Sequence, residues 1–199
     1  MTTYIAMGDS FTAGFQPDTP RWPDQLAHAL GPDVHYENLA SVGATSEQVE
    51  SDQLPRAVAL EPDVVTLVCG ANDVLESTRP NPDTYAVRLS RMFARLRRAA
   101  PSAEILTATY PDLSRFLDLR PRSRARVEKG MSQFNAACRA VAHRHAIVLL
   151  EGFDHPAARR RGTFAEDGFH PSPEGHRRAA AEFLAALTTG LRGKEIAPA

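Results

Sequence analysis

Short apolar runs alternate with longer amphipathic segments along this chain. The apolar runs are typical of β-strands, because they are short and are bounded by glycine, proline or polar residues. The run Val64–Cys69 is almost wholly apolar, which is typical of a central parallel strand that is buried on both faces. The predicted strands lie at about residues 3–8, 34–39, 64–69, 105–110 and 147–150.

The segments between these runs place apolar residues at helical spacing. Two helix starts are marked by a capping side chain followed by proline, at residues 81–82 and 172–173. Another helix is expected to be capped by Thr45 or Ser46, and Pro55 should break or kink it because proline has no N–H. The predicted helices lie at about residues 21–30, 46–60, 82–100, 125–145 and 173–193.

Strands that alternate with helices predict an α/β protein with one parallel sheet and helices on both faces. The 199 residues fit a single domain, and no linker, repeat or low-complexity segment divides the chain. The number of strands favours the flavodoxin-like order 2-1-3-4-5. Residues 193–199, after the last predicted helix, are expected to form a frayed tail.

Polar and small residues follow four of the predicted strands. Ser10 follows the first strand, and Gly43, Asn72 and the segment 167–170 follow the second, third and fifth. Because the carboxyl ends of parallel strands meet at one edge of a sheet, these residues are expected to converge there. Each also has a plain structural interpretation: Ser10 as a turn residue, Asn72 as a helix cap, and His170 as a surface histidine. Only their occurrence together favours a catalytic site.

The four blocks resemble those of the SGNH hydrolase family, also called GDSL-type esterases and lipases. They occur in the family's order and span most of the chain, and they are Gly8-Asp9-Ser10, Gly43, Gly70-Ala71-Asn72-Asp73 and Asp167-Gly168-Phe169-His170-Pro171. Phe11 stands where many members of the family carry leucine, which is a conservative change. The resemblance implies a three-layer α/β/α domain with the SGNH hydrolase fold.

The resemblance also implies a role for each matching residue. Ser10 is the expected nucleophile, His170 the base that takes its proton, and Asp167 the carboxylate that orients the imidazole. The backbone N–H groups of Ser10 and Gly43 and the side-chain amide of Asn72 are the expected oxyanion hole. The expected reaction is cleavage of a carboxylic ester, or of a thioester, through an acyl-serine intermediate, with no metal and no cofactor.

Other functions share part of this pattern. Acyl transfer to an alcohol or amine uses the same acyl-enzyme and is the main alternative, and a catalytically inactive binding module is a weaker one. An α/β-hydrolase needs Gly-x-Ser-x-Gly, whereas Thr12 occupies the place of its second glycine. A phosphate-binding loop needs Gly-Lys-Ser/Thr, which the segment 8–14 lacks. The sequence leaves the acyl and alcohol groups of the substrate open.

Charge and composition narrow the expected partners. The net charge is −1 at pH 7, so no overall field attracts nucleic acid or an anionic membrane. The absence of a leader or a long apolar span favours a cytoplasmic protein with no stable membrane anchor. Cys69 and Cys138 are expected to be buried thiols, and neither belongs to a CxxC pair. The expected partner is a small-molecule ester, and the oligomeric state is left open.

The connection after the fourth predicted strand is rich in arginine and also carries apolar side chains. If this segment overhangs Ser10, it offers an apolar wall with a cationic rim to an anionic acyl substrate. The other interpretation is a solvated surface, which is the usual role of a charged run. The arginines are Arg115, Arg120, Arg122, Arg124 and Arg126.

Overall fold

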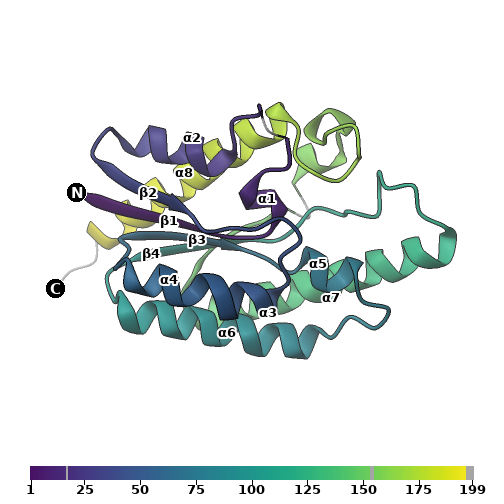
Figure 1. The fold of residues 1–199 in the computed structure, drawn as a ribbon, viewed down its shortest axis with the longest axis horizontal. Coiled ribbons are helices and arrows are strands. Elements are labelled where there is room, and N and C mark those ends of the chain that lie inside the picture. Colours follow the sequence, from purple (N-terminus) through teal and green to yellow (C-terminus); the bar gives the residue numbers. More distant parts are fainter. Residues whose placement is uncertain (17, 153–154, 196–199) are drawn as a thin grey trace.

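Five parallel strands form one sheet in the order β2-β1-β3-β4-β5, as predicted. The computed structural model describes residues 1–16, 18–152 and 155–195. Helices cover both faces of the sheet, which confirms a single domain of three α/β/α layers (Figure 1). The strands are β1 (Thr2–Gly8), β2 (Val34–Asn38), β3 (Val64–Val68), β4 (Glu104–Ala108) and β5 (Val148–Leu150).

The two central strands, β1 and β3, are the most deeply buried part of the sheet. Every residue of β3 is buried, and so is every residue of β1 from Tyr4 onward. The register pairs Tyr4 with Val64 and Gly8 with Val68, so these strands end side by side at one edge. The loops that follow β1 and β3 therefore start next to each other, which brings the first and third sequence blocks together.

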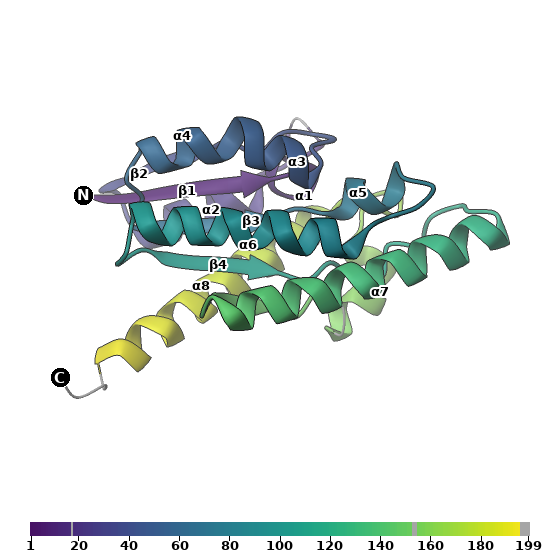
Figure 2. The ribbon, with the colours of Figure 1, turned by 90° about the horizontal axis from the view of Figure 1, so that it is seen from below.

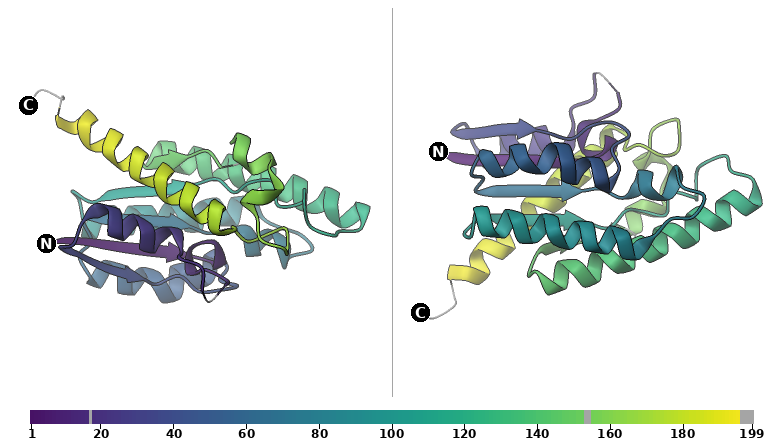
Figure 3. Two further views of the ribbon diagram at one scale, coloured as in Figure 1. Left: turned by 90° about the horizontal axis from the view of Figure 1, so that it is seen from above. Right: turned by 60° about the horizontal axis from the view of Figure 1, so that its bottom comes forward.

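The helices pack in two layers. α2 and α8 pack against each other on one face of the sheet, whereas α4, α6 and α7 lie side by side on the other face (Figure 2; Figure 3). The N-terminal half of α7 continues past the ends of the strands, on the side where the site is expected (Figure 2). These helices are α2 (Trp22–Leu30), α4 (Leu54–Ala59), α6 (Pro82–Ala99), α7 (Pro121–Arg144) and α8 (Pro173–Glu195).

Short helices occupy several places where the sequence indicated loops. α1 (Ser10–Ala13) and α5 (Ala71–Leu75) follow β1 and β3 with almost no intervening chain. α1 forms because the side chain of Asp9 accepts the backbone N–H of Phe11 and so caps the helix. The connection between β5 and α8 contains two 3₁₀ helices, η2 (Pro156–Arg159) and η3 (Arg161–Thr163).

The predicted helix after β2 is divided, as expected from its proline. Thr45 caps α3 (Ser46–Gln48), and the chain then takes π-helical geometry in η1 (Val49–Gln53) before α4 begins. The irregular turn directly precedes Pro55, which has no N–H to donate to the turn before it.

Two predicted helix boundaries were wrong. α7 begins at Pro121 rather than near residue 125, because proline fits the first helical position. α8 continues to Glu195 rather than ending near residue 193, and the rest of the predicted tail, residues 196–199, lies outside the described residues. Among the helices that the structure describes, none has the length and apolar character needed to span a membrane. Cys69 and Cys138 are buried free thiols, as predicted.

Candidate active site

Ser10 lies at the junction of β1 and α1. The strand ends at Gly8, Asp9 caps the helix, and Ser10 is the first helical residue. Ser10 is buried, and so is Asn72 in the first turn of α5, the helix that follows β3. The expected nucleophile therefore stands at the carboxyl edge of the sheet, where the sequence predicts the site.

The turn at residues 167–170 brings a carboxylate to an imidazole. Gly168 has a φ of +72°, a left-handed conformation that glycine adopts without strain. This turn lets Oδ1 of Asp167 accept the backbone N–H groups of Phe169 and His170 at 2.8 and 3.0 Å. Oδ2 of Asp167 lies 2.6 Å from Nδ1 of His170. Burial acts to raise the pKa of Asp167, but the hydrogen bonds outweigh burial and hold this pKa below its ordinary value.

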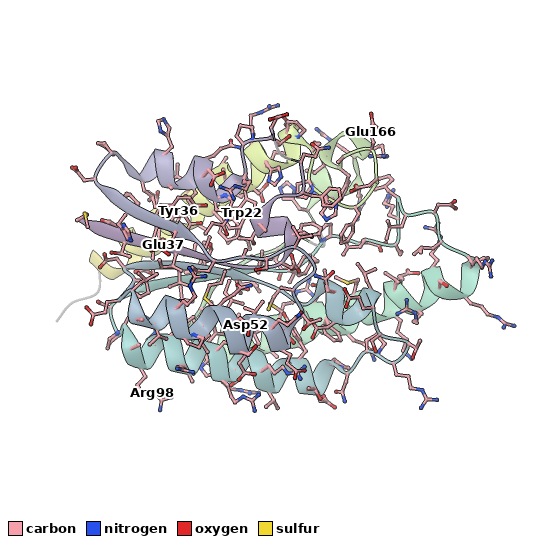
Figure 4. The ribbon with its side chains drawn as sticks, in the orientation of Figure 1. Trp22, Tyr36, Glu37, Asp52, Arg98 and Glu166 are labelled. Atoms are coloured by element: carbon pink, nitrogen blue, oxygen red, sulfur yellow. The ribbon has the colours of Figure 1, made fainter. Side chains whose placement is uncertain are left out.

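His170 connects this turn to Ser10. Its Nε2 atom lies 2.9 Å from Ser10 Oγ, although the two residues are 160 positions apart in the sequence. The imidazole is largely buried, whereas the side chain of Glu166 points outward from the same loop (Figure 4). Both ring nitrogens of His170 thus have a partner, and the three side chains form one continuous line of contacts.

Gly43 lies in the loop after β2, and Asn72 lies in the first turn of α5, just after β3. Gly43 has a φ of +78°, and a Cβ there would meet nothing within 4 Å, so the turn itself requires glycine. Asn72 donates from Nδ2 to the carbonyl of Ala44 at 3.0 Å, which directs its amide towards the Gly43 loop. Asp73 accepts the backbone N–H and the hydroxyl of Ser46 at 2.8 and 2.5 Å. Two consecutive residues of α5 therefore hold the loop that contains Gly43.

Asp9 is fully buried beside Ser10. Its Oδ2 accepts the hydroxyl of Tyr110 at 2.5 Å, and its Oδ1 accepts the backbone N–H of Phe11 at 3.0 Å. Burial raises the pKa of Asp9 to about 7, and these two hydrogen bonds, with a third from the backbone N–H of Ala71, only partly offset this effect. Burial also raises the pKa of Tyr110, so its hydroxyl stays protonated and donates. Asp9 therefore links the start of α1 to the segment after β4.

Two aromatic residues of this site were missed in the sequence. The ring of Phe15 lies parallel to the imidazole of His170, with ring centroids 4.2 Å apart and planes 3° apart. Tyr110 reaches Asp9 from 101 positions away. Tyr110 ends a predicted strand, so its place at the site edge was foreseeable, whereas nothing in the sequence marked Phe15.

Two arginines of the arginine-rich segment form hydrogen bonds with backbone carbonyls. Arg124 donates to two carbonyls of its own connection, and Arg126 of α7 donates to the carbonyls of Val74 and Ser77 around the end of α5. These two guanidinium groups stabilise loops, which is neither of the two interpretations that the sequence left open, a cationic rim and a solvated surface.

Two cavities border the site and differ in polarity. An apolar cavity of about 140 Å³ is lined in part by Phe11, Tyr110 and Phe164. A groove of about 320 Å³, whose lining is of mixed polarity, is bordered in part by Asn72 and Asp73. No three His, Cys, Asp or Glu side chains in the described part of the chain are placed to hold a metal ion.

Comparison with known proteins agrees with this architecture. The sequence profile of the GDSL-like Lipase/Acylhydrolase family matches residues 6–178, and no curated protein matches the chain. The structure of TesA is 24% identical, with a TM-score of 0.73 over 94% of this chain and 98% of that chain. The lipase/acylhydrolase from Enterococcus faecalis is 20% identical, with a TM-score of 0.76 over 94% of this chain and 95% of that chain.

A third structure with the same fold is that of an esterase acting on a carbohydrate ester. Axe2, an acetylxylan esterase from Geobacillus stearothermophilus, is 18% identical, with a TM-score of 0.72 over 94% of each chain. At these identities the structural likeness establishes the fold, whereas the sequence profile covers most of the chain and establishes the family. The chain therefore belongs to the GDSL-like lipase/acylhydrolase family, which confirms its resemblance to the SGNH hydrolases.

Proposed function

We propose that this protein is a serine hydrolase that cleaves small-molecule carboxylic esters through an acyl-Ser10 intermediate. The observation that carries this proposal is the unbroken line of contacts from Ser10 Oγ through His170 to Asp167, at 2.9 and 2.6 Å. A serine hydroxyl is a weak nucleophile at neutral pH unless a base takes its proton. Here a base touches the hydroxyl and a carboxylate touches the base. Family membership supports the same class of reaction.

In the first step, Ser10 Oγ attacks the carbonyl carbon of the ester while its proton passes to Nε2 of His170. The carboxylate of Asp167 accepts a hydrogen bond from Nδ1–H and stabilises the imidazolium, and it stays ionised. The lowered pKa of Asp167 favours the ionised form that this role needs. The imidazolium then gives its proton to the oxygen of the leaving alcohol, and the acyl group stays on Ser10.

The tetrahedral oxyanion is stabilised by three donors in this scheme. The backbone N–H of Ser10 belongs to the first turn of α1, where N–H groups have no helical acceptor. The backbone N–H of Gly43 and the amide of Asn72 complete the set, and the Asn72–Ala44 hydrogen bond supports their closeness. Water then attacks the acyl-enzyme with His170 as base, the acid leaves, and Ser10 regains its proton.

Kinetics with p-nitrophenyl esters of increasing acyl length test this proposal. Ser10→Ala and His170→Ala are each expected to nearly abolish turnover, and the double variant should be little slower than either. The losses do not multiply because the members of a triad act as a unit. Full turnover by Ser10→Ala, or losses that multiply in the double variant, would refute the proposed triad. Thermal unfolding of each variant separates a catalytic loss from a folding defect.

A further inference from the structure

Phenyl rings surround the imidazole of His170. The ring of Phe15 is parallel to it at a centroid distance of 4.2 Å, and the ring of Phe169 is T-shaped to it at 4.5 Å. Asp167 and Ser10 contact the two nitrogens at the edge of the imidazole. The hydrogen bonds therefore lie at the ring's edge, whereas Phe15 covers one of its faces.

Phe15 is unusual because it is a large apolar side chain left in contact with solvent. It is 55% exposed, whereas most large apolar side chains of the described chain are buried. The hydrophobic core does not include this phenyl ring, whereas the ring stacks on the imidazole of His170. We therefore expect the position of Phe15 to affect the imidazole of His170 more than the stability of the fold.

We infer that Phe15 is a positioning residue that holds the imidazole of His170 and stabilises the imidazolium formed during catalysis. This inference rests on the proposed role of His170 as the base for Ser10. Two hydrogen bonds at the ring nitrogens leave the imidazole free to tilt about the line that joins them. A parallel ring in contact with one face opposes that tilt and keeps Nε2 directed at Ser10 Oγ.

The same contact favours the charged state of the ring. The face of a phenyl ring is electronegative, so it attracts a cation more strongly than a neutral imidazole. The imidazolium exists only after His170 has taken the proton, near the transition state of each step. An interaction that strengthens on the way to the transition state accelerates the reaction, whereas one that is equal in both states does not. The expected effect of Phe15 is therefore on kcat.

Kinetics of Phe15→Leu and Phe15→Tyr with p-nitrophenyl acetate test this inference. Phe15→Leu keeps apolar bulk without a π face and is expected to lower kcat roughly 3- to 30-fold, with little change in KM. Phe15→Tyr keeps the ring and should restore most of that loss. Val87→Ala is the matched control, because Val87 is 54% exposed on α6, and its kcat should equal that of the wild type.

NMR chemical shifts of the His170 imidazole detect the Phe15–His170 stack directly. The C–H signals of the His170 imidazole, identified by their loss in His170→Ala, should move downfield in Phe15→Leu as the ring current of the phenyl group disappears. They should stay near their original positions in Phe15→Tyr. Thermal unfolding of Phe15→Leu and Phe15→Tyr should match the wild type, because the side chain of Phe15 is exposed.

The outcomes separate this inference from the proposed function. If His170→Ala is inactive but Phe15→Leu keeps the wild-type kcat, or raises only KM, the inference is wrong while the triad stands. Imidazole signals that do not move in Phe15→Leu would also overturn it. If His170→Ala stays active, the proposed function fails, and the role of Phe15 fails with it.

Discussion

Asp9 offers a test of how the site is stabilised, because a fully buried carboxyl group makes stability depend on pH. Its pKa is raised by burial from the ordinary 3.8 to about 7. An acid with a higher pKa in the folded state binds more protons folded than unfolded. Stability due to Asp9 is therefore fully present below about pH 4 and is lost as the pH rises through about 7. We expect Asp9→Asn, which cannot ionise, to be more stable than the wild type at neutral and alkaline pH.

The size of the effect follows from the same shift. One pKa unit corresponds to about 1.4 kcal/mol. Relative to low pH, the raised pKa of Asp9 then lowers the free energy of unfolding by on the order of 2 kcal/mol at pH 5 and on the order of 4 kcal/mol at pH 8. Asparagine can keep partners at Phe11 and Tyr110, since its oxygen accepts from the Phe11 N–H and its amide donates to the Tyr110 hydroxyl oxygen. The gain in free energy of unfolding should therefore be larger at pH 8 than at pH 5 by roughly 2 kcal/mol.

Urea unfolding of the wild type and Asp9→Asn at pH 5 and pH 8 measures this difference. Other groups titrate over the same range, but they are common to both proteins and cancel in the comparison. Val87→Ala is the control, because it changes an exposed apolar side chain on α6 without removing a titrating group, and its effect should be the same at both pH values. An equal gain for Asp9→Asn at both pH values, or a larger gain at pH 5, would refute the reasoning.

Two further predictions concern the proposed oxyanion hole. Asn72→Ala is expected to lower kcat by on the order of 10²–10³ with a smaller effect on KM, because the Asn72 amide would bind charge that appears in the transition state. Ester kinetics measure both constants, and a change confined to KM would make Asn72 a substrate-binding residue. Ser46→Ala removes one hydrogen bond to the Asp73 carboxylate, and it should cost about 1–3 kcal/mol of stability and also lower kcat. Ser51→Ala, which removes an exposed serine–aspartate hydrogen bond, is the matched control, and an unchanged kcat in Ser46→Ala would show that this bond does not set the Gly43 loop.

The strands and the edge where the site lies were predictable because local sequence determines them. The apolar run of β3 ends at Gly70-Ala71-Asn72, and a buried parallel strand followed by glycine indicates both the strand and its loop. The start of α7 was less clear, since its first large apolar side chain is Val127 and the arginines before it hide the helical spacing. Pro121 marked the true start, four residues before the predicted one.

The contacts around the reacting groups were not predictable, because they join residues that lie far apart in the sequence. Tyr110 and Asp9 are separated by 101 positions, and their hydrogen bond depends on where the segment after β4 crosses α1. The Phe15–His170 stack likewise depends on the path of two loops. Periodicity and turn chemistry describe neighbours within a few residues, so they carry no information about such pairs.

The position of each proposed reacting group depends on residues that do not react. The side chain of Gln53 accepts the backbone N–H of Gly8 at 2.8 Å and donates to the Gly8 carbonyl at 2.9 Å. Gln53 is the last residue of the π-helical turn η1. An extra residue in such a turn shifts the side chains that follow around the helix, and this is why π turns occur often at functional sites. Arg126 binds carbonyls at the end of α5, the helix whose first turn carries Asn72. Donors fixed in this way need no reorganisation when the oxyanion forms, which is the main advantage of a preorganised site over water. Arg126, which charge alone made a candidate for substrate binding, is thus expected to support the proposed oxyanion hole through the helix that holds Asn72.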